Sequence, residues 1–214
     1  MSQVPGARRI IIGLSGASGV IYGVRLLEVL RERTDMECHV VMTRIAELTL
    51  RVETRYRTND IEQLAHRLYD CSNLAAAISS GSFRTAGMIV APCSVRTLGA
   101  LVNSIDDNLL VRAADVCLKE RRPVVLLVRE TPLHLGHLRL MAQAAEMGAV
   151  ILPPVPAFYH RPKTIDDLVL HTVGKSLDQF GIDVQAFRRW QDRMPVSEEA
   201  AWPGDGAGIP RQLE

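Results

Sequence analysis

The chain has 214 residues, of which 47% are hydrophobic, so it is long enough for one domain with a sizeable core. Its 25 lysines and arginines balance 24 aspartates and glutamates, a formal net charge of +1 that argues against a nucleic-acid or membrane-surface protein. Four scattered cysteines without a C-x-x-C pair indicate neither a zinc site nor a disulfide framework.

Short apolar segments alternate with helical periodicity along most of the chain. The segments predicted as strands are 9–14, 37–42, 87–91, 124–128 and 149–152. The segments predicted as helices are 19–33, 44–53, 60–70, 94–102, 108–121, 134–147 and 164–181. Strands rich in Val, Ile and Leu between helices predict an α/β fold, a doubly wound parallel sheet with helices on both faces.

We assign residues 1–192 to this domain and expect 193–214 to form a poorly ordered tail, because glycine is frequent there and apolar residues are few. No apolar run reaches the roughly 18 residues of a membrane span, and no secretory pattern precedes the first strand. We therefore expect a cytoplasmic protein that is not bound to a membrane.

Residues 13–19 read Gly-Leu-Ser-Gly-Ala-Ser-Gly, between the first predicted strand and the helix that begins near Val20. Glycines let a ligand approach the backbone, Ser15 and Ser18 offer hydroxyl groups, and a helix N-terminus presents free N–H groups. No Gly-Lys-Ser/Thr follows, and the spacing is not G-x-G-x-x-G. The loop therefore predicts a phosphate-bearing ligand other than a nucleoside triphosphate or a conventional NAD.

Polar residues also follow two later strands. Ser94 and Thr97 open a helix, which suits a ligand with several polar groups such as a flavin but is equally typical of an ordinary N-cap. Arg129 and Glu130 end a strand that should be buried, so they form either a surface terminus or the floor of a site. Their place at the carboxyl end of a strand, where such sheets bind ligands, favours the second interpretation. A carboxylate beside a phosphate could then exchange protons with it.

Charged residues lie on two predicted helices whose other residues are mostly apolar. Arg112, Asp115 and Lys119 share one stripe of helix 108–121, which is either a solvated face with ion pairs or a cationic stripe facing an anion or a partner subunit. Lys175 lies near the apolar stripe of the last helix, where it either extends to solvent or pairs with an anion.

His134 and His137 are three residues apart and could share a metal, but no further ligands are nearby in the sequence, so we expect packing roles and no metal site. Trp190 follows the last helix, beyond the end of a compact core, where a large aromatic side chain needs another surface to cover it. We expect that surface to be a second copy of the chain.

Several stretches, in order and up to about Trp190, together resemble the UbiX/Pad family of flavin prenyltransferases. They are residues 13–19, 78–83, 92–97, 112–120, 128–133, 137–141 and 153–160. The resemblance implies that the dimethylallyl group of dimethylallyl phosphate is joined to N5 and C6 of reduced FMN, without a metal. It also implies a flavodoxin-like or Rossmann-like fold and a homododecamer. It further implies a place in ubiquinone biosynthesis and a UbiD-type decarboxylase that receives the prenylated FMN.

The resemblance assigns roles to individual residues. Those expected to hold FMN are Gly16, Ala17, Ser18, Thr43, Ser94, Val95, Arg96, Thr97 and Arg112. Those expected around the substrate phosphate are Tyr159, Lys175, Arg129 and Lys119. Those expected in catalysis are Glu130, Lys119, Glu53 and Ser18. Lys175 stands where arginine is common, so the charge is kept but the bidentate fork is lost.

Two alternatives have a related fold. An FMN-dependent decarboxylase of the cysteine type would carry a histidine near the start of an early helix and a later Asn/Met motif, and we find neither clearly in the sequence. A decarboxylase subunit that only stores flavin would have no use for Glu130, Lys119 and Tyr159.

Overall fold

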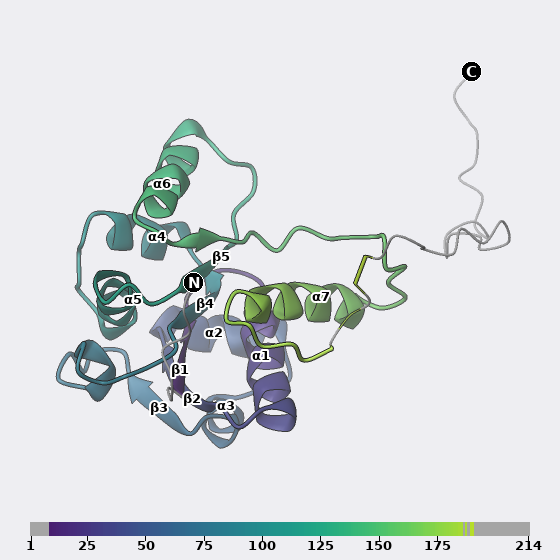
Figure 1. Cartoon of the computed structure of the whole chain (residues 1–214), viewed down its shortest axis with the longest axis horizontal. Helices are drawn as coiled ribbons and strands as arrows, with labels where there is room; N and C mark the ends of the chain where they lie inside the picture. Colours follow the sequence, from purple (N-terminus) through teal and green to yellow (C-terminus); the bar gives the residue numbers. More distant parts are fainter. Residues whose placement is uncertain (1–8, 186, 188, 191–214) are drawn as a thin grey trace, which may run out of the picture.

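The computed structural model describes residues 9–185, 187, 189 and 190, and the predicted tail 193–214 lies outside them (Figure 1). One sheet of six parallel strands has the order β3-β2-β1-β4-β5-β6. The strands are β1 (Arg9–Leu14), β2 (Glu37–Met42), β3 (Arg67–Asp70), β4 (Met88–Cys93), β5 (Val124–Val128) and β6 (Val150–Ile151).

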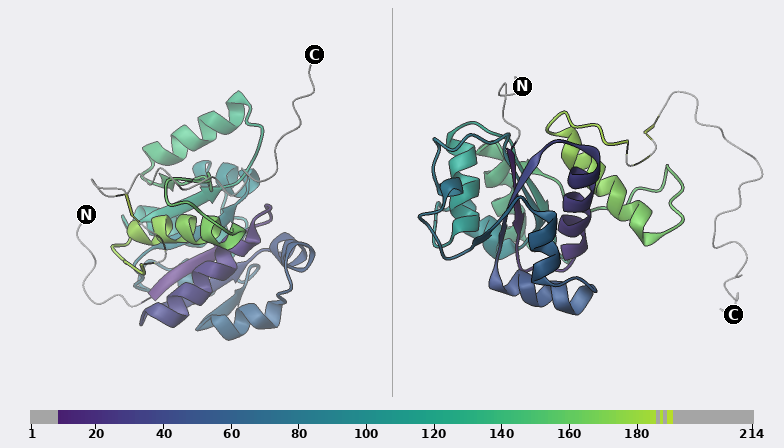
Figure 2. Two further views of the ribbon diagram at one scale, coloured as in Figure 1. Left: turned by 90° about the vertical axis from the view of Figure 1, so that its right-hand side faces the viewer. Right: turned by 90° about the horizontal axis from the view of Figure 1, so that it is seen from below.

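Helices cover both faces of the sheet (Figure 2). The helices on one face are α1 (Val20–Arg33), α2 (Arg44–Glu53), α3 (Thr58–Leu64) and α7 (Ile165–Asp178). Those on the other are α4 (Val95–Val102), α5 (Leu109–Lys119) and α6 (Leu135–Glu146). The predicted doubly wound α/β fold is confirmed. No helix within the described part of the chain is both long and apolar enough to span a membrane.

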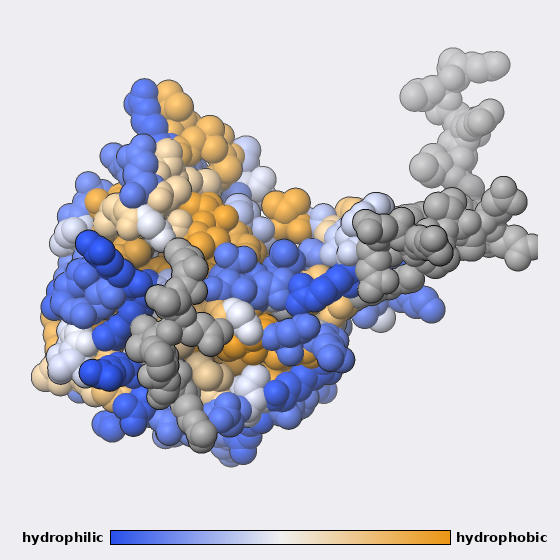
Figure 3. Space-filling view, viewed as in Figure 1, coloured by the Kyte–Doolittle hydropathy of each residue, from blue (hydrophilic) through white to orange (hydrophobic). Residues whose placement is uncertain are grey.

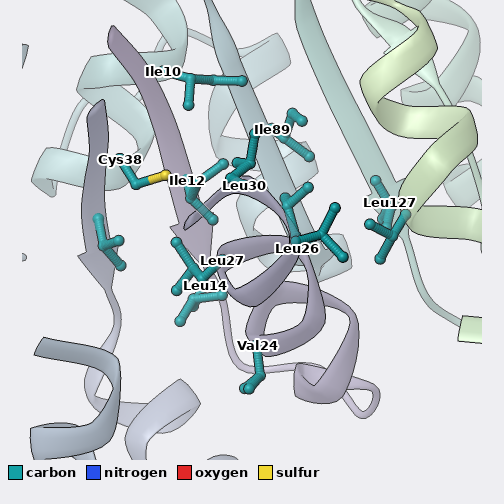
Figure 4. Packing of buried hydrophobic residues seen from close by; sticks show 14 of the residues in the cluster. Ile10, Ile12, Leu14, Val24, Leu26, Leu27, Leu30, Cys38, Ile89 and Leu127 are labelled. Carbon is teal, nitrogen blue, oxygen red and sulfur yellow. The ribbon is translucent and has the colours of Figure 1, made fainter. Parts of the chain in front are cut away.

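The central strands are buried on both faces, as their unbroken apolar sequences predict. Successive side chains of β1 enter opposite cores, because Ile10 and Ile12 pack with α1 while Ile11 packs with α5. Figure 4 shows Ile12 and Leu14 beside side chains of α1, among them Leu27. Apolar contact on both sides makes this region the rigid base of the fold.

Residues 60–70 were predicted as one helix, and this is wrong. The helix ends at Leu64, and β3 forms from Arg67 to Asp70 and pairs with β2 at the edge of the sheet. Ile61, Leu64 and Leu68 have helical spacing, but an edge strand is only partly buried, so its sequence carries a weak pattern. The other strand predictions are confirmed, with shifts of one or two residues at the ends of β4 and β6.

Candidate active site

The strand order reverses between β1 and β4, so the crevice of this fold opens where these two strands end. At this point Ser15 joins the loop after β1 to the end of β4 by hydrogen bonds. Its buried hydroxyl donates to the Pro92 carbonyl at 2.9 Å and accepts from the Ser94 N–H at 2.7 Å. Ser15 is thus used within the protein, and Ser18 is the exposed hydroxyl of this loop.

The N-terminus of α1 is capped by a carboxylate from another helix. Gly19 is the N-cap residue, with φ of 95°, and supplies no side chain. Glu53, the last residue of α2, accepts from the N–H groups of Gly19 and Val20 at 2.8 and 3.3 Å. These were the donors that the loop sequence assigned to a phosphate. The protein fills this position with its own negative charge, which the helix dipole favours.

Three predicted site residues meet in one pocket of about 370 Å³. Ser18 and Glu53 line it from the α1 side, and Arg129 lines it from the end of β5. Apolar and aromatic residues form the rest of its wall, namely Ile21, Tyr22, Pro154, Ile165 and Val169. A guanidinium, a carboxylate and a hydroxyl in a largely apolar pocket form a site that can orient an anion beside an apolar group.

Gly16 and Thr43 hold the neighbouring loops in place. A Cβ on Gly16 would lie 2.4 Å from the Ile45 side chain, so glycine lets the loop approach α2. Thr43 is the N-cap of α2, and its hydroxyl accepts from the Ala46 N–H at 3.2 Å. Ala17 is half-buried and donates its N–H to the Ser15 carbonyl.

The loop after β4 forms an N-cap, one of the two interpretations that the sequence left open. Ser94 caps α4 by accepting from the Thr97 N–H at 3.2 Å, and the two hydroxyl oxygens are 3.0 Å apart. Arg96 is largely exposed and pairs with Asp107 at 2.6 Å. Val95, between Ser94 and Arg96 in the chain, is half-buried. The loop therefore presents Ser94 and Val95 next to Ser15 at the crevice.

Arg112 is already occupied by protein groups. Its guanidinium pairs with Asp106 at 2.9 Å and Asp115 at 3.3 Å, and it donates to the Ser79 carbonyl. Of the two interpretations of this helical stripe, the structure shows the ion pairs.

Lys119 lies far from the pocket within one chain. Helix α5 begins beside the carboxyl end of β3, where Leu109 donates to the Cys71 carbonyl. Lys119 is the last residue of this helix, about 16 Å from its start, and β5 begins shortly after it. Lys119 therefore lies at the end of the sheet where the strands begin, and Arg129 lies at the end where they finish. Lys119 pairs with Glu120 at 2.7 Å. Lys119 and Arg129 therefore cannot share a ligand within one chain.

Lys175 and Tyr159 do not line the pocket. Lys175 follows Ile165, the pocket residue in the first turn of α7, by ten positions, about 15 Å along the helix. Lys175 is exposed and lies 3.5 Å from Asp178, a carboxylate that also binds Arg189. The Tyr159 hydroxyl contacts His171, a buried residue one helical turn before Lys175. Glu130 is exposed beside Arg129, and its carboxylate accepts from the Thr131 N–H.

Tyr22, Ile165 and Val169 of the pocket wall are not among the site residues that the sequence predicts. Tyr22 lies one helical turn after Gly19, and burial raises the pKa of its phenol. Its position one turn after the glycine-rich loop is the sequence feature that could have placed it in the site. No sequence feature places Ile165 and Val169 there, because they reach the pocket only through the packing of α7 on α1.

Comparison with known proteins places the chain among flavoproteins. The family model described as Flavoprotein matches residues 2–174. The flavin prenyltransferase UbiX of Escherichia coli (strain K12) is 60% identical over 186 residues, which cover 86% of this chain and 98% of that protein.

Two solved structures are similar in fold and sequence. One is AnUbiX (PadA1) in complex with FMN and dimethylallyl pyrophosphate, with a TM-score of 0.86 and 46% identity over 88% of this chain and 100% of that one. The other is a dodecameric FMN-dependent UbiX-like decarboxylase from Escherichia coli O157:H7, with a TM-score of 0.84 and 48% identity over 86% of this chain and 99% of that one.

Proposed function

The chain belongs to the UbiX family of flavin prenyltransferases, and from this premise we propose how its own residues act on dimethylallyl phosphate and reduced FMN. The protein is a flavin prenyltransferase that uses FMN. The observation that supports the placement of its site is the pocket at the β1/β4 crevice, in which Ser18, Glu53 and Arg129 meet.

The crevice fits a flavin, because two hydroxyl-bearing loops and an apolar wall converge there. We assign FMN to the residues at the carboxyl ends of β1, β2 and β4, namely Gly16, Ala17, Ser18, Thr43, Ser94, Val95, Arg96 and Thr97. Arg112 is left out of this set, because two carboxylates already bind its guanidinium. Reduced FMN supplies the nucleophilic N5 and C6 atoms when bound.

The substrate phosphate requires cations, because negative charge grows on it as the allyl group departs. Arg129 supplies one in the pocket, and we assign Lys119, Lys175 and the Tyr159 hydroxyl to the same phosphate. In this proposal these groups, rather than a metal, stabilise the leaving group. Val169 and the exposed Ile165 line the pocket, and in this proposal they pack against the allyl group once it is bound.

Glu130 is assigned the handling of protons. It follows Arg129, which lines the pocket, and is itself exposed. Ring closure requires a proton to reach the prenyl alkene, and C6 then loses a proton as it bonds to the resulting cation. A phosphate with a second pKa near 6 can deliver the first proton and take up the second if a carboxylate beside it assists. Glu53 keeps a fixed position through two backbone N–H groups, so it serves better as a fixed charge than as a mobile base.

This set of residues requires more than one copy of the chain. Lys119 lies at the end of the sheet where β5 begins, Arg129 lies at the end where β5 finishes, and Lys175 is exposed on α7 without lining the pocket. The related decarboxylase is dodecameric, and we propose the same assembly here, with neighbouring copies completing each site. We further propose that a UbiD-type decarboxylase receives the prenylated FMN, in the cytoplasm.

The test is direct. Purified protein is incubated with dimethylallyl phosphate and FMN kept reduced under anaerobic conditions, with a chelator present, and the flavin is examined by mass spectrometry. A flavin enlarged by one five-carbon unit supports the proposal. Unchanged flavin that stays bound indicates a flavin carrier, and release of carbon dioxide from an acid substrate indicates a decarboxylase.

A further inference from the structure

Tyr159 is held by a histidine that the proposed function does not use. The Tyr159 hydroxyl lies 3.1 Å from Nε2 of His171, which is on α7, one helical turn before Lys175. Tyr159 belongs to the segment 152–163 between β6 and α7, which forms no helix or strand. Side-chain contacts must therefore fix the phenol, whereas His171 is fixed by its helix.

The imidazole of His171 is itself firmly packed, with 8% of the residue's surface exposed. His160 stacks on it with ring centroids 4.9 Å apart and planes inclined by 6°, and Phe187 lies edge-on at 4.6 Å. Tyr159 packs edge-on against both His171 and Trp190. A ring held on several sides keeps its nitrogen in one place, so the bond to Tyr159 has a fixed direction.

The charge state of His171 suits a donor. Burial lowers its pKa, and nearby His160 and Lys175 lower it further, so the ring is neutral at pH 7 and carries one N–H. When Nε2 carries that proton, it donates to the phenol oxygen and leaves the phenol proton free to donate to another acceptor. A phosphate between Tyr159 and Lys175 is such an acceptor.

We propose that His171 is a positioning residue, which orients the Tyr159 hydroxyl so that it donates its proton to the substrate phosphate beside Lys175. The inference rests on the proposed function, because it needs Tyr159 to bind dimethylallyl phosphate. It adds a residue that touches neither substrate nor flavin and acts only through Tyr159.

The test compares His171→Phe with His171→Gln. Phenylalanine keeps an aromatic ring between His160 and Tyr159 but has no N–H, whereas the glutamine amide can still donate. For His171→Phe we expect the KM for dimethylallyl phosphate to rise about five- to tenfold, the size of one lost hydrogen bond, with FMN binding unchanged. For His171→Gln we expect a KM within about twofold of wild type.

A double-mutant cycle separates positioning from packing. In a Tyr159→Phe background, His171→Phe should raise the KM no further, because the hydroxyl that it positions is already gone. An unchanged KM in His171→Phe, or equal loss with His171→Gln, overturns the inference. Failure of the wild type to prenylate FMN overturns the proposed function instead. The binding of dimethylallyl phosphate to wild type and His171→Phe, measured by calorimetry, then decides the role of His171 without turnover.

Discussion

At the scale of single residues, Glu53 shapes the site more than its exposed position suggests. Its carboxylate bonds to two N–H groups at the start of α1 and also lines the pocket, so one charge both caps a helix and faces the ligand. A phosphate of the substrate or of FMN must then bind to the cations and to other donors. Arg129 is the cationic side chain that lines this pocket.

Replacing Glu53 by Gln should lower the stability of the protein as well as the rate of prenyl transfer. The amide oxygen can still accept a hydrogen bond, but the interaction of the charge with the helix dipole is lost. We expect the free energy of unfolding, measured in urea, to fall by roughly 0.5–1 kcal/mol. Glu62→Gln, an exposed change on α3, is the control and should leave stability unaltered. Equal stability of the Glu53 variant and wild type would show that the cap contributes nothing.

Replacing Glu130 by Gln should affect chemistry alone. The amide keeps the acceptor for the Thr131 N–H, so the loop should keep its shape. Without an ionisable group, the rate of prenyl transfer should fall roughly 100-fold, the usual contribution of a positioned acid or base. Stopped-flow mixing of substrate with the protein–FMN complex measures this rate, and FMN titration checks that affinity is unchanged. A normal rate would move the proton-handling role to Glu53.

At the scale of elements, the first turn of α7 is fixed to α1 by a chain of polar contacts. Arg25 of α1 makes two bonds to Asp166, at 2.8 and 2.9 Å, and also contacts Glu28. The Tyr56 hydroxyl donates to Glu28 at 2.6 Å. Because Ile165 adjoins Asp166 and lines the pocket, this chain of contacts sets the position of one wall.

Breaking that contact with Asp166→Asn should loosen the wall without unfolding the protein. An exposed ion pair contributes less than about 1 kcal/mol, so stability should change little. The KM for dimethylallyl phosphate should rise several-fold, because Ile165 and Val169 no longer hold the allyl group firmly. Steady-state kinetics measure this, with Asp35→Asn, before β2 and remote from the pocket wall, as the control. An unchanged KM would remove α7 from the substrate wall.

The same turn of α7 should respond to acid. The backbone N–H groups of Lys163 and Thr164 bond to the Asp167 carboxylate and lower its pKa. A lowered pKa in the folded state means that the stabilisation is present above the ordinary aspartate pKa and is lost as the pH falls through the folded value. The stability gap between wild type and Asp167→Asn, from urea unfolding, should therefore close below about pH 4. A gap that persists at lower pH contradicts this assignment.

How far the sequence predicts these elements depends on burial. The buried strands such as β1 and β5 can be predicted, because an unbroken run of Val, Ile and Leu is typical of a strand covered on both faces. The edge strand β3 cannot, because its pairing comes from the neighbour and not from its own residues. The same limit applies to the site. The sequence points to Ser18, because it lies in a continuous glycine-rich loop that lines the pocket. The cap by Glu53 and the wall at Val169 arise from contacts between distant segments, which no single stretch of sequence reveals.

At the scale of the whole molecule, Lys119 and Lys175, two of the cations expected to bind the phosphate, do not line the pocket of their own chain. The part of the chain that the structure describes also has an exposed apolar face. Leu133, Leu135 and Leu138 are exposed at and before the start of α6, where Figure 3 shows hydrophobic surface gathered. Such a face is typical of contact with another protein surface. Lys119 and Lys175 do not line the pocket of their own chain, so the proposed function requires neighbouring copies to bring these cations to it.

Complementation between two inactive variants tests this requirement most directly. Arg129→Ala and Lys119→Ala chains, carrying different tags, are co-expressed, and mixed assemblies are purified through both tags and assayed for prenylated FMN by mass spectrometry. If each site takes Arg129 and Lys119 from different copies, random mixing should restore about one quarter of the wild-type rate, although neither variant alone is active. If both residues of a site come from one chain, the mixed assemblies will be as inactive as their parents.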